Sequence, residues 1–467
     1  MNTCLGVIFG NRDFFPDHLV SEARQDILAL FKEMNIEAVL LGENETKLGS
    51  VETYAHAKAC ADLFKANRDR IEGILVVLPN FGDEKGVADT IKLSGLNVPI
   101  LVQAYPDDLE AFNVERRRDS FCGKVSVCNN LRQYGFDFSL TSLHTSPPKS
   151  ESFKKDLQEF VGVCRVVKGL RSARLGAIGA RPGAFNTVRY SEKILQASGI
   201  TVTTVDLSEI LGDSDRLSDD APSVKAKLEE IQAYAKHETV PSDAIVRMAK
   251  LGVVISDWMQ ANDIQATALQ CWTSIQKNYG INACTLMSMM SNQLMPSACE
   301  TDITGVVSMY ALQLASNSPG ALVDWNNNYA DDPDRCVLFH CGNWAKSFVP
   351  DIEIKTAPIL GTTLGEENTY GAMAGRAAAG PMTYARVSTD DSNGIIRAYT
   401  GEGELTNDPL DTFGHRAVLY TPNLQKLLAY ICRNGFEHHV AMTMNHVALV
   451  LTEAFSTYMK WDVYHHQ

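Results

Sequence analysis

The sequence lacks several features that would assign it to a large class of proteins. None of its apolar runs reaches the roughly 18 residues that a membrane-spanning helix needs. The N-terminus has no basic start and no long apolar core, so we expect no signal peptide. Basic residues are in the minority, with 42 Lys and Arg against 56 Asp and Glu. The resulting net charge of −14 argues against nucleic acid as a partner.

The eleven cysteines are an odd number and include no CxxC pair. This pattern is typical of a reduced cytoplasmic protein, not of a disulfide framework. Cys4, Cys122 and Cys284 lie in apolar or mixed segments, and we predict that they are buried thiols. The chain of 467 residues, 45% hydrophobic and 21% charged, is long enough for two or three globular domains.

The first two thirds of the chain alternate apolar strands with amphipathic helices. We predict strands at 4–10, 37–42, 73–79 and 99–104, and, after a long helix at 151–170, a second series with strands at 174–179, 200–207 and 264–270. This order indicates an α/β fold with two doubly wound parallel sheets. The segment 105–150 is expected to be irregular, and the glycines after 179 do not form a clean dinucleotide-binding motif.

Beyond residue 318 the pattern changes to short strands and turns. We expect strands at 321–324, 335–340, 352–360, 380–389, 394–400 and 415–420, which form an antiparallel, barrel-like domain. The predicted domains are therefore 1–150, 151–318 and a C-terminal β-rich domain at 319–467.

Two carboxylates, Glu300 and Asp324, stand at the ends of apolar runs. A buried carboxylate is costly unless a cation holds it. Oxygen ligands with an imidazole suit a hard divalent ion such as Mn²⁺ or Mg²⁺. The alternative is structural: a turn position for Asp324 and a helix cap nearby, a role that suits Asp302 better.

Histidines close to these acids are further candidates. One residue of the pair His438-His439, at the start of an apolar strand, can point inward as a ligand. His340 ends another apolar strand, where it is either a satisfied core histidine or a residue in or beside the site. At predicted strand ends, Arg12, Gln270, Trp272 and Asn343 suit a site that holds sugar hydroxyls and stacks a sugar ring on an aromatic.

Several short motifs together resemble the L-fucose isomerase / L-arabinose isomerase superfamily, closest to its shorter fucose-isomerase-like branch. The resemblance covers nearly the whole chain in the same order. The motifs that carry it are Asn11-Arg12-Asp13-Phe14-Phe15-Pro16, Gln270-Cys271-Trp272, Ala298-Cys299-Glu300-Thr301-Asp302, the Asp324 turn, Phe339-His340-Cys341-Gly342-Asn343 and His438-His439.

This resemblance implies a cytoplasmic aldose–ketose isomerase that works as a homo-oligomer, with a hexamer favoured. Its cofactor would be Mn²⁺, or another divalent metal such as Mg²⁺ or Co²⁺. By motif, Glu300, Asp324 and His439 would be the metal ligands, and the arabinose branch has a further histidine ligand near His340. The reaction would pass through a cis-enediol, with Glu300 and Asp324 as the catalytic acid/base pair.

Two alternatives concern the ligand. The substrate could be a hexose with a charged group at C6, sulfonated or phosphorylated, for which Arg12, Arg181 and Lys346 are candidate cations. A non-catalytic sugar-binding protein also has two α/β domains, but the missing signal peptide and the Glu300, Asp324 and His439 set count against it.

Overall fold

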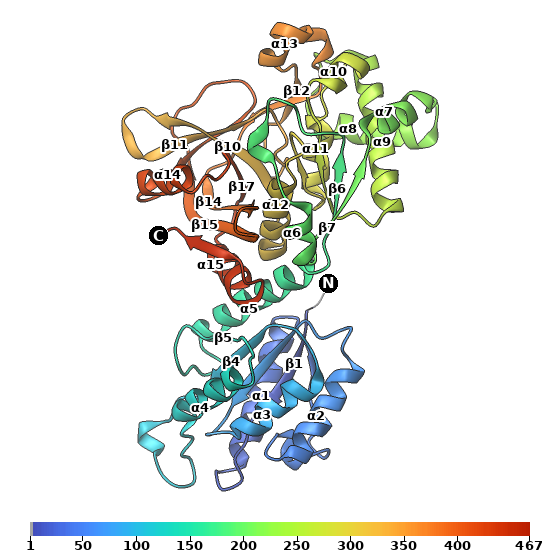
Figure 1. The fold of residues 1–467 in the computed structure, drawn as a ribbon. Helices are drawn as coiled ribbons and strands as arrows, with labels where there is room; N and C mark the ends of the chain where they lie inside the picture. Colours follow the sequence, from blue (N-terminus) through green and yellow to red (C-terminus); the bar gives the residue numbers. More distant parts are fainter. Residues whose placement is uncertain (1–2) are drawn as a thin grey trace. The chain divides into compact units, whose positions relative to one another are not determined.

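The computed structural model describes residues 3–467, which form two compact units (Figure 1). The first contains residues up to 168 together with 453–460, and the second contains 169–452 together with 461–467. The predicted boundaries at 150 and 318 stay predictions. Among the helices of residues 3–467, none is long and apolar enough to cross a membrane.

The N-terminal unit is a doubly wound α/β domain. All its strands are parallel, in the order β2 (Glu37–Val39), β1 (Cys4–Phe9), β3 (Gly73–Leu78), β4 (Ile100–Ala104) and β5 (Ser139–Leu140). Both faces of this sheet are buried, which explains why its strands are continuous apolar runs in the sequence. One face packs on α2 (Tyr54–Ala66), α3 (Glu84–Ser94) and α4 (Ser120–Gln133), and the other on α1 (His18–Glu33) and α5 (Glu151–Leu170).

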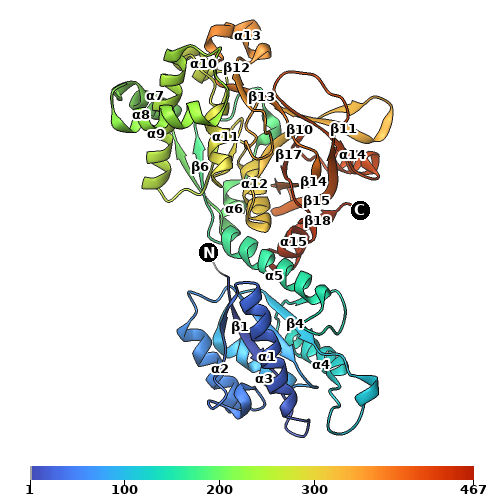
Figure 2. The same cartoon turned by 180° about the vertical axis from the view of Figure 1, so that it is seen from behind.

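The second unit begins with a smaller parallel sheet. Its order is β7 (Thr201–Val205), β6 (Arg174–Ile178), β8 (Ala266–Leu269) and β9 (Ser297–Ala298). The accompanying helices are α6 (Glu192–Ala197), α7 (Leu207–Arg216), α8 (Pro222–Tyr234), α9 (Ser242–Ala261), α10 (Ser274–Tyr279), α11 (Cys284–Asn292) and α12 (Ile303–Ser316), most of them visible in Figure 2. Both predicted parallel sheets are confirmed.

The same unit ends in a nine-stranded mixed sheet, part of which closes into an antiparallel barrel. The closed ring is β10 (Ala321–Tyr329), β11 (Asp332–His340), β16 (His415–Tyr420), β15 (Ile395–Thr406), β14 (Gly380–Asp390) and β17 (His439–Thr443). The sheet also includes β12 (Glu353–Lys355), β13 (Ala372–Arg376) and β18 (Asp462–His465). The barrel-like prediction is confirmed, because the pairing of β15 with β16 closes the ring.

Three local predictions are wrong. The expected strand at 352–360 ends at Lys355, and Pro358 instead opens helix α13 (Pro358–Leu364), where its fixed φ suits the first turn. The segment 105–150 contains helix α4, whose buried stripe includes small and polar residues. Cys122 lies off that stripe and is exposed, whereas Cys4 and Cys284 are buried.

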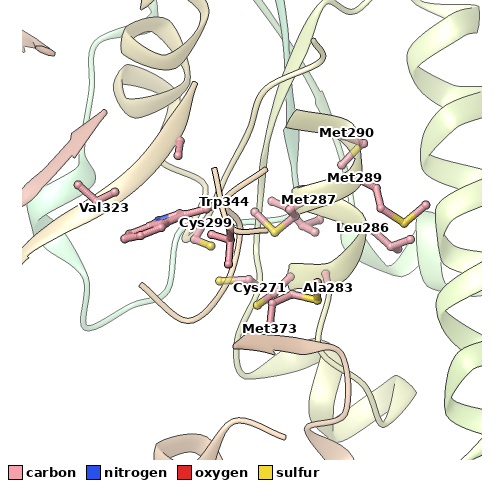
Figure 3. Packing of buried hydrophobic residues seen from close by; sticks show 14 of the residues in the cluster. Cys271, Ala283, Leu286, Met287, Met289, Met290, Cys299, Val323, Trp344 and Met373 are labelled. Atoms are coloured by element: carbon pink, nitrogen blue, oxygen red, sulfur yellow. The ribbon is translucent and has the colours of Figure 1, made fainter. Parts of the chain in front are cut away.

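The remaining helices are α14 (Leu424–Arg433) and α15 (Ala448–Glu453). The π-helical turn that follows (Ala454–Tyr458) belongs to the first unit. The core of the second unit runs from the parallel sheet into the barrel without interruption. Around α11 this core is rich in sulfur (Figure 3). One apolar core therefore connects the parallel sheet, which contains β8 and β9, with the barrel.

Candidate active site

Neighbouring barrel strands place three of the candidate residues side by side. Asp324 on β10 pairs directly with His439 on β17 and with Phe339 on β11. His340 follows Phe339 at the end of β11. Directly paired residues on antiparallel strands have Cα atoms only about 4.5–5.5 Å apart. The backbone ladder itself therefore brings the Asp324 and His439 side chains together.

Glu300 reaches the same place from the parallel sheet, in the short connection between β9 and α12. Its φ of 55° and the φ of 56° at Thr301 are both in the left-handed region. Such a conformation costs a non-glycine residue about 1–2 kcal/mol, and it tends to persist at functional sites. The Glu300 carboxylate is aimed by Trp272, whose indole N–H donates to Oε1 at 2.7 Å.

Four donor atoms converge at this point. His439 Nε2 lies 3.7 Å from Glu300 Oε2 and 3.5 Å from Asp324 Oδ1, and His340 Nε2 lies 3.9 Å from Glu300 Oε2. Within residues 3–467, both carboxylate oxygens are buried without a hydrogen-bond partner. Buried polar atoms are normally paired, so these two oxygens beside the same histidine nitrogen form a site that suits a cation.

Burial dominates the electrostatics of Glu300. Burial raises the pKa of its carboxyl above the ordinary value, and the nearby His340 and His439 offset only part of this effect. A positive ion at Oε2 would remove the penalty on the charged form. Glu300, His340 and His439, and likewise Asp324, His438 and His439, each have donor atoms within 4.8 Å of one another, close enough to share one ion.

A buried ion-pair network holds His439. Its Nδ1 lies 2.9 Å from Asp302 Oδ2, and Arg386 donates to both oxygens of Asp302 at 2.6 and 3.0 Å and to Glu437 at 3.0 Å. Burial would raise the pKa of Asp302, but Arg386 and the hydrogen bond from His439 outweigh burial and hold it well below its usual range. Asp302 is therefore ionised and accepts a hydrogen bond from Nδ1 of His439, which leaves Nε2 as the ring nitrogen that faces Glu300 and Asp324.

The ring of His340 has the opposite tautomer. Its Nδ1 accepts a hydrogen bond from the backbone N–H of Cys341 at 3.0 Å. Because an accepting nitrogen carries no proton, the ring proton lies on Nε2, the nitrogen that faces Glu300. Both rings therefore approach Glu300 through Nε2, but Nδ1 donates a hydrogen bond in His439 and accepts one in His340.

The four donor atoms lie at the wall of a cavity of about 410 Å³. Its lining is mostly aromatic and aliphatic, and includes Phe185, Trp272, Phe339 and Phe413. Phe185 comes from the loop after β6 and contacts the rings of Trp272, His438 and His439. Of the lining residues within 3–467, none is Lys or Arg. An apolar pocket with a few convergent polar groups is the usual form of a small-molecule site.

The other predicted site residues are placed as follows. Trp272 and His340 line the cavity. Gln270 lines a neighbouring cavity and accepts from the Ala180 N–H, and buried Asn343 donates to the Ser297 carbonyl. Arg12 belongs to the N-terminal unit, where it pairs with Glu84 and stacks on Phe81. The substrate-binding roles of these residues stay predictions.

Sequence reasoning missed the network behind His439. The sequence predicts a helix cap for Asp302, and its Oδ1 does accept from the Gly305 N–H, but Oδ2 also orients His439. Arg386 and Glu437 were not singled out. A signal existed for Arg386, because it stands between Ala385 and Val387 in an apolar strand, where a buried guanidinium requires carboxylates.

Two family descriptions match the chain. Residues 6–171 match the N-terminal domain of fucose/sulfoquinovose isomerase, and residues 338–466 match the C-terminal domain of L-fucose isomerase. Among curated relatives, a sulfoquinovose isomerase of Priestia aryabhattai is 25% identical over 345 residues, 72% of this chain and 74% of that one. A sulfoquinovose isomerase of Clostridium sp. (strain MSTE9) is 27% identical over 237 residues, 50% of this chain and 51% of that one.

A solved periplasmic solute-binding protein of Actinobacillus succinogenes, with bound D-allose, aligns with a TM-score of only 0.18 and 8% identity, over 68% of this chain and 93% of that one. The family matches at both ends of the chain agree with the named relatives and with the fold. The chain therefore belongs to the fucose/sulfoquinovose isomerase family and is a sugar isomerase that interconverts an aldose and a ketose.

Proposed function

We propose that the isomerase depends on a divalent cation held by Glu300, Asp324 and His439. The observation that carries this proposal is the pair of buried, unpartnered oxygens, Glu300 Oε2 and Asp324 Oδ1, on either side of the free His439 Nε2. Two carboxylate oxygens and one imidazole form a hard donor set. This set favours Mn²⁺, with Mg²⁺ or Co²⁺ as substitutes, and the residues present fit such an ion.

The chemistry moves one proton between two adjacent carbons and one between their oxygens, through a cis-enediol. A bound divalent cation would supply Lewis-acid stabilisation of the charge that develops on the two oxygens. Glu300 is positioned as the base for the carbon-bound proton, since Trp272 fixes Oε1 and leaves Oε2 facing the pocket. Asp324, whose side chain is 23% exposed, is the other member of the pair: it would supply a proton to the neighbouring carbon and regain one from solvent, while Glu300 releases the proton that it took.

His340 is assigned the transfer at oxygen. Its Nε2–H points into the cavity beside Glu300, where it can donate to a sugar oxygen as charge develops there. The aromatic lining, including Phe185 and Trp272, limits the water that competes for these protons and provides a ring for the apolar face of a sugar. Within this proposal His340 is a proton donor, and His439 is a ligand.

For the substrate we propose an aldose with a sulfonate at C6, because the curated relatives carry the name sulfoquinovose isomerase. The cavity lining contributes no Lys or Arg from residues 3–467, so the sulfonate would have to meet cations beyond this lining. Of the earlier candidates, Arg181 lines a different cavity and Lys346 lies over the ring of Tyr234. A neutral aldose such as L-fucose is the second candidate, favoured by the lack of Lys and Arg in the lining that residues 3–467 provide.

The test is an isomerisation assay on protein dialysed against EDTA, with and without added Mn²⁺, followed by NMR. The sugars are sulfoquinovose, glucose 6-phosphate, L-fucose, D-arabinose, L-arabinose and L-rhamnose. Conversion restored by Mn²⁺ supports the proposal, and the sugar converted fastest decides the substrate. Full turnover in EDTA would contradict metal dependence. Glu300→Gln should be inactive, and the matched control Glu404→Gln, on a half-exposed barrel residue, should be active.

Two broader parts of the proposal concern the whole protein. We infer a homo-oligomer, a hexamer by family resemblance, which light scattering on the purified protein tests. We also infer a reducing, cytoplasmic compartment, because all eleven cysteines are free thiols. A monomer in solution would refute the first inference, and secretion of the native protein would refute the second.

A further inference from the structure

Four buried or half-buried cysteines form a connected row directly behind the active site. Cys271 follows β8, Cys284 opens α11, Cys299 follows β9 and Cys341 follows β11. Cys341 Sγ lies 3.7 Å from Cys284 Sγ, and Cys299 Sγ lies within 4.8 Å of the sulfurs of both Cys271 and Cys341. Figure 3 shows Cys271 and Cys299 together with Met287 and Met373 in the same sulfur-rich part of the core.

Two of these sulfurs lie close to Nδ1 of His340, a residue that also lines the active-site cavity. Cys299 Sγ lies 3.7 Å and Cys341 Sγ lies 3.5 Å from Nδ1 of His340. All three donor atoms lie within 4.8 Å of one another. The imidazole of His340 therefore has oxygen donors on its Nε2 side and sulfur donors on its Nδ1 side.

These separations can be compared with those of a metal site. Zinc–sulfur bonds of about 2.3 Å and zinc–nitrogen bonds of about 2.0–2.1 Å, in tetrahedral geometry, place ligand S and N atoms about 3.5 Å apart and two ligand S atoms about 3.8 Å apart. Both sulfur–nitrogen distances are already close to the first value. The Cys341–Cys284 distance matches the second, so Cys284 is a candidate fourth donor.

We propose that Cys299, Cys341 and His340 Nδ1 form a second metal site, selective for a thiophilic cation such as Zn²⁺, Cd²⁺ or Cu⁺. Thiolate and imidazole donors favour such ions, whereas the carboxylate set favours Mn²⁺ or Mg²⁺. Cys341 lines the 410 Å³ cavity and gives an ion from solution access to the row. An ion there displaces the Cys341 N–H from Nδ1 and fixes the His340 ring, so we expect it to inhibit the isomerase.

The first test measures Cd²⁺ binding to Mn²⁺-loaded protein, without sugar. We expect one tightly bound Cd²⁺ per chain with a thiolate-to-cadmium absorption band in the ultraviolet. Cys299→Ser and Cys341→Ser should each weaken this binding by roughly tenfold or more. Cys432→Ser, which changes an exposed thiol, is the matched control and should bind Cd²⁺ as the wild type does. A band that survives both site variants, or that Cys432→Ser removes, would overturn the proposal.

The second test uses the unmodified chain, so it does not depend on the folding of a variant. Alkylation by iodoacetamide is followed by mass spectrometry with and without Cd²⁺. Cys341 should react roughly tenfold more slowly with Cd²⁺ bound, because a coordinated thiolate is a poor nucleophile, while exposed Cys122 should react at the same rate in both samples. Equal rates at Cys341 would refute the site. Neither readout requires turnover, so a failure of the proposed function would not be mistaken for a failure here.

Discussion

The carboxylate of Asp302 gives the sharpest test of the site, because Asp302→Asn changes its charge at nearly constant size. Asp302 accepts from His439 Nδ1, from two nitrogens of Arg386 and from the Gly305 N–H. The amide of asparagine has only one oxygen and no charge, so it cannot replace all of these bonds. Both the proton on His439 Nδ1 and the neutralisation of Arg386 are lost or weakened.

The expected effect has two parts. Breaking a buried ion pair while leaving its partner in place costs about 3–5 kcal/mol of folding stability. Loss of the hydrogen bond that orients a ligand histidine typically lowers metal affinity by about 10–100-fold. Urea unfolding of the metal-free protein at pH 7 measures the first quantity, and Mn²⁺ titration followed by electron paramagnetic resonance measures the second.

The pH dependence has a definite sign. Because the pKa of Asp302 is depressed in the folded state, its contribution to stability is present above the unfolded-state value of about 3.9 and is lost as pH falls through the lower folded value. Asp302→Asn should therefore flatten the acid limb of the stability curve. The control is Asp411→Asn, since Asp411 is fully exposed and should shift stability by less than about 0.5 kcal/mol. An Asp302→Asn protein with wild-type stability and Mn²⁺ affinity would refute the network.

Three further predictions concern the same site. Glu300→Gln should lower turnover by about 10²–10⁴-fold. Because burial raises the pKa of Glu300, the folded protein loses stability as the pH rises and this carboxyl ionises. Urea unfolding should therefore find the metal-free variant more stable than the wild type at pH 7, and a less stable variant would contradict this sign. Trp272→Phe removes a hydrogen bond to the carboxylate and should lower kcat about tenfold to a hundredfold, with little effect on folding; an unchanged kcat would dismiss this role. Mn²⁺ at 100 times its Kd should stabilise the fold by about 2.7 kcal/mol in thermal unfolding, and EDTA should reverse this; a melting temperature indifferent to Mn²⁺ would count against the ligand set.

The parallel sheets could be predicted because their strands are buried on both faces. Runs such as Gly73–Leu78 have no polar residue to confuse their assignment. Prediction failed where the apolar pattern was weak. Helix α4 buries Ser120, Gly123 and Lys124, and Pro358 begins a helix directly after a three-residue strand. Closure of the barrel depends on the pairing of β15 with β16, which no local pattern encodes.

The converging carboxylates were found for a physical reason that sequence can reveal. An acid at the end of an apolar run is costly, so Glu300 and Asp324 stood out without a structure. The apolar neighbours of Arg386 indicate a buried guanidinium, but they do not identify the carboxylates that neutralise it. Its partners Asp302 and Glu437 lie 84 and 51 residues away in the chain. Only the three-dimensional fold shows that this guanidinium is neutralised in the core.

The barrel also determines which parts of this enzyme can change. Asp324 and His439 oppose each other on paired strands of a closed ring, so the backbone ladder fixes their spacing. The segment from Thr356 to Leu360 lines the same cavity but lies outside the ring, in the connection from β12 into α13, and Ile359 within it is 66% exposed. Substitutions there can reshape the cavity wall without moving Asp324 or His439. An enzyme built in this way can acquire new sugars during evolution, or in a designed library of this one segment, while its chemistry is inherited unchanged.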